Sequence, residues 1–255
     1  MHTRGNEKIM DTKELNKELI DAIKERRSHP LIGIIGSTFP SREYSPEQGY
    51  EAGFVLREFL NGNKGNLFTG GVDGVGIDIY GGIIRYCYTN STKTNTLADR
   101  FFVLVPETEF LRGKKGMQPV PYEPPQGYKV LGMLSSDHKL NVEVAGSNMA
   151  ERRIYLAEIG DIFVVVNGGY GTIDEANLAL TKQKPVISLS NTGGAARVLA
   201  NIKTGSYDET LENMLKQNNP SIKSLFEPTA FQNILLASNI QEAITQISDY
   251  LDNKS

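Results

Sequence analysis

The sequence predicts one α/β domain built on a doubly wound, mostly parallel sheet. Short apolar runs, unbroken by polar residues, alternate along the chain with segments of helical length, which is typical of consecutive βαβ units. Stretches rich in glycine and small polar residues follow several of the apolar runs, as expected where a parallel strand ends and a helix begins. Because βαβ crossovers are right-handed, helices cover both faces of the sheet, and we expect a Rossmann-like single domain.

The first elements are a charged surface helix, a strand and a second helix. The first helix is predicted over 7–27, because its leucines and isoleucines form a single apolar stripe among charged residues. The apolar run 31–35 is expected to be a strand buried on both faces. Ser45 and Pro46 are favoured residues for an N-cap and a first helical position, so the second helix begins there and ends near residue 60.

The later elements repeat this alternation. Further apolar runs predict strands at 66–69, 101–105, 140–144, 162–166, 186–189 and 234–237. The segments that follow or separate them predict helices at 77–86, 149–159, 172–182 and 240–251. The stretch at 191–219 has a weaker pattern and predicts only helix and loop.

One insertion interrupts the domain. We place an N-terminal helical unit at 1–28 and the Rossmann-like domain at 29–255. Five of the 11 prolines lie between residues 106 and 125, beside the basic residues of 112–115. A loop of this length inside a compact domain is a functional lid or a partly disordered segment, so an insertion is predicted at about 107–128.

Composition and charge disfavour several classes of protein. With 27 Lys and Arg against 30 Asp and Glu, the net charge is −3, so no cationic excess is available to neutralise the phosphates of a nucleic acid. The single cysteine, Cys87, cannot form an intramolecular disulfide, and three histidines disfavour a His-rich zinc site. No apolar run reaches the roughly 20 residues that span a bilayer, and the N-terminus lacks a signal-peptide core. We therefore expect a cytoplasmic protein without a nucleic-acid or membrane partner.

Three loops lie at the carboxyl ends of predicted strands, where doubly wound domains bind their ligands. They are residues 36–38, 70–76 and 167–172. None has the G-x-G-x-x-G spacing of a dinucleotide site, and the chain contains no G-x-x-x-x-G-K-[ST] phosphate loop. A generic NAD enzyme and a P-loop ATPase are therefore disfavoured.

The third loop carries the strongest signal for a ligand. Gly168, Gly169 and Gly171 let the backbone approach a ligand closely, and a helix begins at about Ile173. The unpaired N–H groups and the dipole of a helix start favour a phosphate there. The alternative is a tight turn in which Thr172 and Glu175 form a capping box.

The helix before this loop carries two adjacent arginines. Arg152 and Arg153 are interpreted either as part of a solvated helix face or as ligands of the same crevice. The second interpretation rests on position, because Arg152 lies near the start of its helix, at the carboxyl edge of the preceding strand.

Together these segments resemble the "lonely guy" family of phosphoribohydrolases, also described as lysine-decarboxylase-like, with an SLOG-type Rossmann domain. The family pattern reads M-H-x-R-K and then P-G-G-x-G-T-x-x-E. This sequence has, in register, Met149, Arg152, Arg153, Gly168, Gly169, Gly171, Thr172 and Glu175. Further matches over roughly residues 31–200 are Gly36-Ser37, Thr69-Gly70-Gly71 and Lys184-Pro185-Val186. Departures from the family pattern are the predicted insertion and Ala150, Arg153 and Asn167, which stand where the family has His, Lys and Pro.

The resemblance implies an enzyme that cleaves the N-glycosidic bond of a nucleoside 5′-monophosphate to free base and ribose 5-phosphate. In this reading Glu175 stabilises an oxocarbenium-like state and orients water, and Arg152 holds the ligand and positions the carboxylate. No metal or cofactor is required, and a homodimer is implied. The nucleotide- and phosphate-binding residues would be Gly36, Ser37, Gly70, Gly71, Met149, Arg153, Gly168, Gly169, Tyr170, Gly171 and Thr172.

Two alternatives use the same crevice. The first is a non-catalytic nucleotide sensor or carrier, which the departures at Ala150 and Asn167 favour. The second is a deoxyribosyltransferase-like enzyme that moves the sugar between bases. Base exchange without net release of ribose phosphate would distinguish the transferase from the hydrolase.

Overall fold

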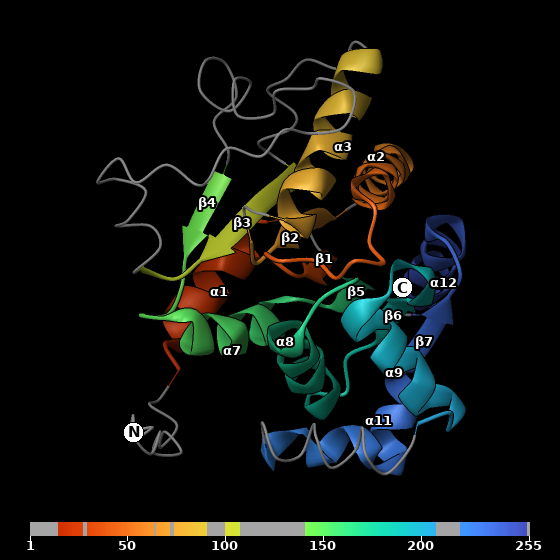
Figure 1. Ribbon diagram of the computed structural model, residues 1–255. Coiled ribbons are helices and arrows are strands. Elements are labelled where there is room, and N and C mark those ends of the chain that lie inside the picture. The colour runs from red at the N-terminus through yellow and green to blue at the C-terminus, as the bar shows by residue number, and fades with distance from the viewer. Residues whose placement is uncertain are drawn as a thin grey trace, which may run out of the picture.

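The fold is an α/β sandwich of one parallel sheet between two layers of helices (Figure 1). It is given by a computed structural model that describes residues 15–27, 30–63, 65–71, 74–90, 100–107, 141–207 and 220–253. All seven strands pair in parallel, in the order β4-β3-β2-β1-β5-β6-β7. The predicted doubly wound Rossmann-like fold is confirmed.

The strands lie where the apolar runs predicted them. They are β1 (Leu31–Gly36), β2 (Asn66–Thr69), β3 (Phe101–Val105), β4 (Asn141–Val144), β5 (Ile162–Val166), β6 (Val186–Leu189) and β7 (Ile234–Ala237). Each of the central strands β1, β2, β3 and β5 is almost entirely buried, because helices cover the sheet on both sides.

The described helices include the predicted ones and add α9 within the weakly patterned stretch 191–219 and two further helices between residues 220 and 233. The α-helices are α1 (Lys17–Arg26), α2 (Pro46–Gly62), α3 (Val75–Thr89), α7 (Met149–Ile159), α8 (Tyr170–Thr181), α9 (Gly194–Thr204), α11 (Pro228–Asn233) and α12 (Ile240–Asp252). Two 3₁₀ helices are η2 (Ser190–Thr192) and η3 (Pro220–Phe226). Residues 7–14 of the first predicted helix, residues 208–219, and the predicted insertion from residue 108 onward lie outside the described residues.

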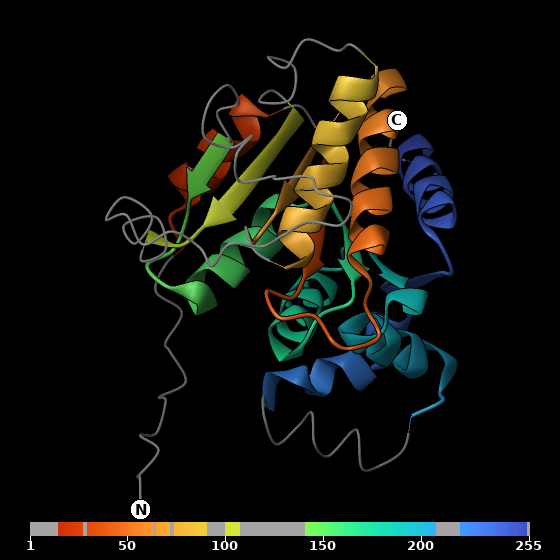
Figure 2. The same cartoon turned by 45° about the horizontal axis from the view of Figure 1, so that its top comes forward.

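Two apolar clusters fill the space between the sheet and the two helical layers. Helices α2, α3 and α12 pack on one face, where Figure 2 shows them side by side. Helices α1, α7, α8, α9 and α11 pack on the other face. Gly33 in β1 leaves room for aromatic rings on this second face, since a Cβ there would lie 2.5 Å from Cδ1 of Phe163. None of the described helices is long and apolar enough to span a bilayer.

The order of the strands places a crevice beside the central strand. The chain runs outward from β1 through β2 and β3 to β4, and then returns to pair β5 with the opposite side of β1. The loops after β1 and β5 therefore diverge to opposite faces at the carboxyl edge, where Gly36 pairs in register with Val166. This is the switch point at which doubly wound folds bind ligands.

Candidate functional site

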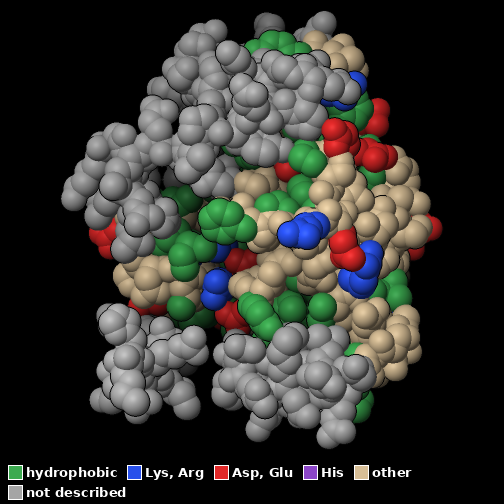
Figure 3. All heavy atoms as spheres, in the orientation of Figure 1, with side chains coloured by type: hydrophobic (Ala, Val, Ile, Leu, Met, Phe, Trp, Pro, Cys, Tyr) green, Lys and Arg blue, Asp and Glu red, His purple; other side chains and the backbone are tan. Residues whose placement is uncertain are grey.

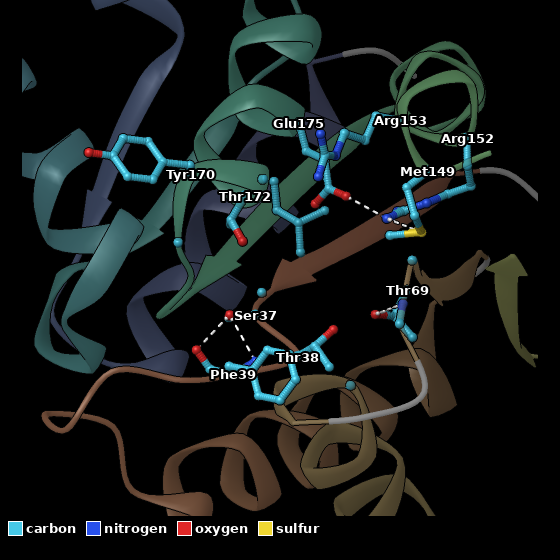
Figure 4. Close-up of a pocket in the computed structure, with 17 residues that line it drawn as sticks. Ser37, Thr38, Phe39, Thr69, Met149, Arg152, Arg153, Tyr170, Thr172 and Glu175 are labelled. Atoms are coloured by element: carbon cyan, nitrogen blue, oxygen red, sulfur yellow. Dashed lines mark hydrogen bonds and ion pairs between the residues drawn. The ribbon is translucent and has the colours of Figure 1, made fainter. Parts of the chain in front are cut away.

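A pocket of about 310 Å³ lies at this switch point. Its volume is within the range of small-molecule sites. All the predicted site residues except Gly168 line it, and they come from the ends of β1 and β2, from α7 and from the start of α8 (Figure 4). The lining also includes residues outside the predicted set, namely Ile35, Thr38, Phe39, Thr69 and Gly76.

The N-terminus of α8 forms one wall of the pocket. The helix begins at Tyr170, earlier than the sequence predicted, and its N-cap is Gly169, whose missing side chain can offer no cap. Thr172 and Ile173 donate their N–H groups to the carbonyl of Gly169, at 3.0 and 3.1 Å. The N–H groups of Tyr170 and Gly171, at the very start of the helix, are therefore the ones available to an anion. Thr172 is the third residue of the helix and not its N-cap. The capping-box alternative for Thr172 and Glu175 is therefore wrong.

Two glycines before α8 have different structural roles. Gly168 has a φ of 106°, and a Cβ there would lie 2.6 Å from the side chain of Thr172, so the turn itself requires glycine. Gly169 has a φ of −120° that any residue can adopt. A Cβ at Gly169 would meet only Oγ of Ser37, at 4.0 Å. Glycine at this second position therefore leaves open space beside the helix N-terminus.

A buried ion pair joins α7 to α8 in the wall of the pocket. Nη2 of Arg152 lies 2.8 Å from Oε1 of Glu175, and the two side chains are 3% and 6% exposed. Arg152 is thus not part of a solvated face. Its Nε and Nη1 atoms have no hydrogen-bond partner among the described residues. The Arg152 guanidinium is therefore a buried cation beside the pocket with two donor atoms still unused.

Local sequence explains how this arginine reaches the pocket. The side chain of Asn148 accepts hydrogen bonds from the N–H groups of Ala150 and Glu151, so α7 begins at Met149 and Arg152 lies in its first turn. The guanidinium then passes over Gly70 at the end of β2, where a Cβ would overlap Nη1. A side chain at Gly70 would therefore displace the guanidinium of Arg152 from this position.

A second pair lies beside the first. Nη1 of Arg153 is 3.3 Å from Oδ2 of Asp174, and these side chains are 26% and 20% exposed. Burial raises the pKa of the Glu175 carboxyl above its usual value, although the guanidinium groups of Arg152 and Arg153 act in the opposite direction. The site therefore contains two guanidinium groups, one shielded carboxyl group and a helix N-terminus.

Asn167 organises the loops around the pocket. Its φ is 52°, in the left-handed region that asparagine tolerates better than most residues. Its Oδ1 accepts from the N–H of Ser41 at 3.0 Å, and its Nδ2 donates to Oγ of Ser41 at 2.7 Å and to the carbonyl of Thr192 at 2.6 Å. The sequence marked this residue only as a departure from the family pattern, because the contacts are with residues distant in sequence.

Within the described part of the chain, no group of three His, Cys, Asp or Glu side chains is arranged to hold a metal ion. Cys87 is buried in α3. Among the lining residues outside the predicted set, Thr38, Thr69 and Gly76 belong to or adjoin the glycine-rich loops, whereas Phe39 had no signal in the sequence.

Comparison with known proteins supports the same superfamily. A sequence model of the SLOG cluster4 family matches residues 130–223, a segment that includes α7, β5 and α8. No match to a curated protein sequence was found. The crystal structure of TM1055 is similar over 87% of this chain and 99% of its own, with 20% identity and a TM-score of 0.51, which shows a shared fold. The family match supports an SLOG-type superfamily, and the structural similarity shows the fold.

Two further solved structures have lower similarity. The molybdenum cofactor binding protein from the phototrophic bacterium Rippkaea orientalis is 19% identical over 87% of this chain and 97% of its own, with a TM-score of 0.46. The molybdenum cofactor carrier protein from Chlamydomonas reinhardtii is 17% identical over 88% of this chain and 98% of its own, also with a TM-score of 0.46.

Proposed function

We propose that the pocket binds a nucleoside 5′-monophosphate and that the protein hydrolyses its N-glycosidic bond. The observation that carries this proposal is the placement of the buried Arg152–Glu175 pair in the same pocket wall as the uncapped start of α8. Side chains on a helix tilt toward its N-terminus. Glu175, in the second turn of α8, therefore reaches back toward the space beside a phosphate bound at the first turn.

The reaction breaks the bond between C1′ of the ribose and a ring nitrogen of the base. The bonding electron pair leaves with the base, which takes up a proton, and a water oxygen bonds to C1′ after losing a proton. Positive charge develops on the sugar in between, and an ionised Glu175 carboxylate stabilises it. Arg152 holds the carboxylate through the 2.8 Å contact, and the N–H groups of α8 hold the phosphate.

Binding without cleavage is the second candidate function. The observation that favours it is the shielding of Glu175, whose side chain is 6% exposed and directs one oxygen to Arg152. A carboxylate held in this way positions the guanidinium of Arg152, whose unused Nε and Nη1 donors can bind a phosphate ligand. In that case the protein is a nucleotide sensor or carrier.

The test measures release of ribose 5-phosphate from AMP, GMP, CMP and UMP. We expect Glu175→Gln to lower the rate by about 10²–10³, because an amide does not stabilise the developing charge. The matched control is Glu143→Gln, which changes another arginine-paired carboxylate, bound to Arg26 and Arg27 and not part of the pocket lining. Its rate should equal that of the wild type.

Each remaining outcome has a defined meaning. Nucleotide binding by the wild type without release of ribose 5-phosphate would contradict the hydrolase and support the sensor or carrier. Exchange of labelled base without net release would indicate a transferase. A wild type that binds none of the four nucleotides would contradict the proposed ligand class itself.

A further inference from the structure

Exposed apolar side chains gather at the mouth of the pocket. In the described part of the chain, four large hydrophobic residues are exposed, and three of them, Phe39, Met149 and Tyr170, line this pocket. The fourth, Tyr88, lies elsewhere, at the end of α3. On the face in Figure 3, hydrophobic side chains border a hollow in which basic and acidic side chains lie together. Exposed apolar groups gathered at a hollow indicate a binding surface.

Phe39 is the most exposed of the four, at 88%, and its backbone is nevertheless held in place. Oγ of Ser37 accepts a hydrogen bond from the N–H of Phe39 at 3.0 Å and donates one to its carbonyl at 2.8 Å. Two residues later, the N–H of Ser41 donates to the buried side chain of Asn167. The loop is therefore fastened on both sides of Phe39, so its ring is presented to solvent by a fixed backbone.

The stick view defines the two walls between which a ligand would lie. Ser37, Thr38 and Phe39 form one side, and Met149 and Arg152 lie on the opposite side (Figure 4). The ring of Tyr170 points away from these side chains. An aromatic ring and a thioether thus face one space that also contains a cation and a helix N-terminus.

We propose that Phe39 stacks on a flat heteroaromatic ring of the ligand, the base of the nucleotide, while Met149 contacts the ring from the opposite wall. This inference rests on the proposed function and adds the residue that recognises the base. Stacking removes apolar surface of both rings from water, and it tolerates different bases because every base has a π-face. A methionine sulfur also makes favourable contacts with aromatic rings. Phe39 is therefore a binding residue for the base and not for the phosphate.

The test compares ligands with and without a base. Binding of AMP, GMP, CMP, UMP and ribose 5-phosphate is measured by isothermal titration calorimetry, in the wild type and on the Glu175→Gln background, where turnover is suppressed. We expect Phe39→Ala to weaken nucleotide binding roughly tenfold and to leave ribose 5-phosphate binding unchanged. Phe39→Trp should retain the affinity for nucleotides. Tyr88→Ala is the matched control, since it removes an exposed aromatic ring outside the pocket.

The outcomes separate this inference from the proposed function. Equal weakening of ribose 5-phosphate and nucleotides by Phe39→Ala would show that the residue only shapes its loop, and unchanged nucleotide binding would show that the base lies elsewhere. Both results overturn the inference about Phe39 but do not contradict the proposed phosphate site. The inference is also overturned, and the phosphate site retained, if the wild type binds ribose 5-phosphate and binds none of the nucleotides more tightly than ribose 5-phosphate. Binding of neither ligand overturns the proposed function together with the inference.

Discussion

Replacing Arg152 with methionine should destabilise the protein, because Glu175 would then keep a buried negative charge without its partner. The two side chains are in contact at 2.8 Å and both are almost fully buried. Removing one member of such a pair typically costs about 3–5 kcal/mol. For a chain of this size, the loss corresponds to a fall in melting temperature of roughly 6–20 °C at neutral pH.

The loss of stability caused by Arg152→Met should also depend on pH, in a direction set by the pKa of Glu175. Burial raises the pKa of Glu175 above its usual 4.5, and the loss of Arg152 removes a contact that lowers this pKa. A carboxyl group whose pKa is raised on folding stabilises the folded state below the unfolded pKa, and this contribution is lost as pH rises through the folded pKa. The slope is at most about 1.4 kcal/mol per pH unit. The defect of Arg152→Met should therefore shrink as pH falls toward 4.5.

Thermal unfolding followed by far-UV circular dichroism, repeated across this pH range, measures both effects. The matched control is Arg153→Met, which breaks the partly exposed pair with Asp174 and should cost about 0–1 kcal/mol. The double variant Arg152→Met/Glu175→Leu should regain most of the loss, because it removes both charges. The proposed role of the ion pair is refuted if Arg152→Met lowers the stability no more than the control does, or if the double variant is less stable than either single variant.

Two shorter predictions concern the backbone of the site. Gly169→Val should lower the free energy of unfolding by only about 1 kcal/mol, as expected for valine at an N-cap. It should nevertheless weaken ribose 5-phosphate binding at least about tenfold, because the new side chain occupies open space facing Ser37. Calorimetry and a melting curve test it, and unchanged affinity would remove this loop from the site. Asn167→Ala should lower the free energy of unfolding by at least about 2 kcal/mol, because it breaks three side-chain hydrogen bonds and places alanine at a φ of 52°. Asn167→Gly, which tolerates that φ, should lose less, and equal melting temperatures for the two variants would contradict the backbone argument.

The strands and most of the helices could be read from the sequence because their signals are local. A strand buried on both faces needs a continuous apolar run, and 162–166 satisfies this without reference to any other segment. Ser45 and Pro46 likewise specify the start of α2 through groups within one helical turn, and the observed capping box includes Gln48. The glycine-rich loops that follow β1, β2 and β5 could be identified because glycine, too, is a local signal, and all three loops line one pocket.

Neighbouring residues do not determine where α8 begins or which partners its polar side chains bind. Thr172 and Glu175 have the spacing of a capping box, and nothing near them in sequence distinguishes that arrangement from the observed one. The competing partner of Glu175 is Arg152, which lies 23 positions earlier on a different helix. Only the packing of α7 against α8 decides that the carboxylate pairs with the guanidinium and leaves the helix N-terminus open.

The class of fold, the positions of the strands and the glycine-rich loops at their carboxyl ends follow from local sequence, since apolar runs and turn residues act over a few neighbours. Three other features arise from tertiary packing: the strand order that sets β1 beside β5, the burial of Arg152 over Gly70 and the exposure of Phe39 at the pocket. These features depend on contacts between segments far apart in the chain. Burial and pairing are properties of the space that a side chain enters, and that space exists only once the sheet and its helices have packed.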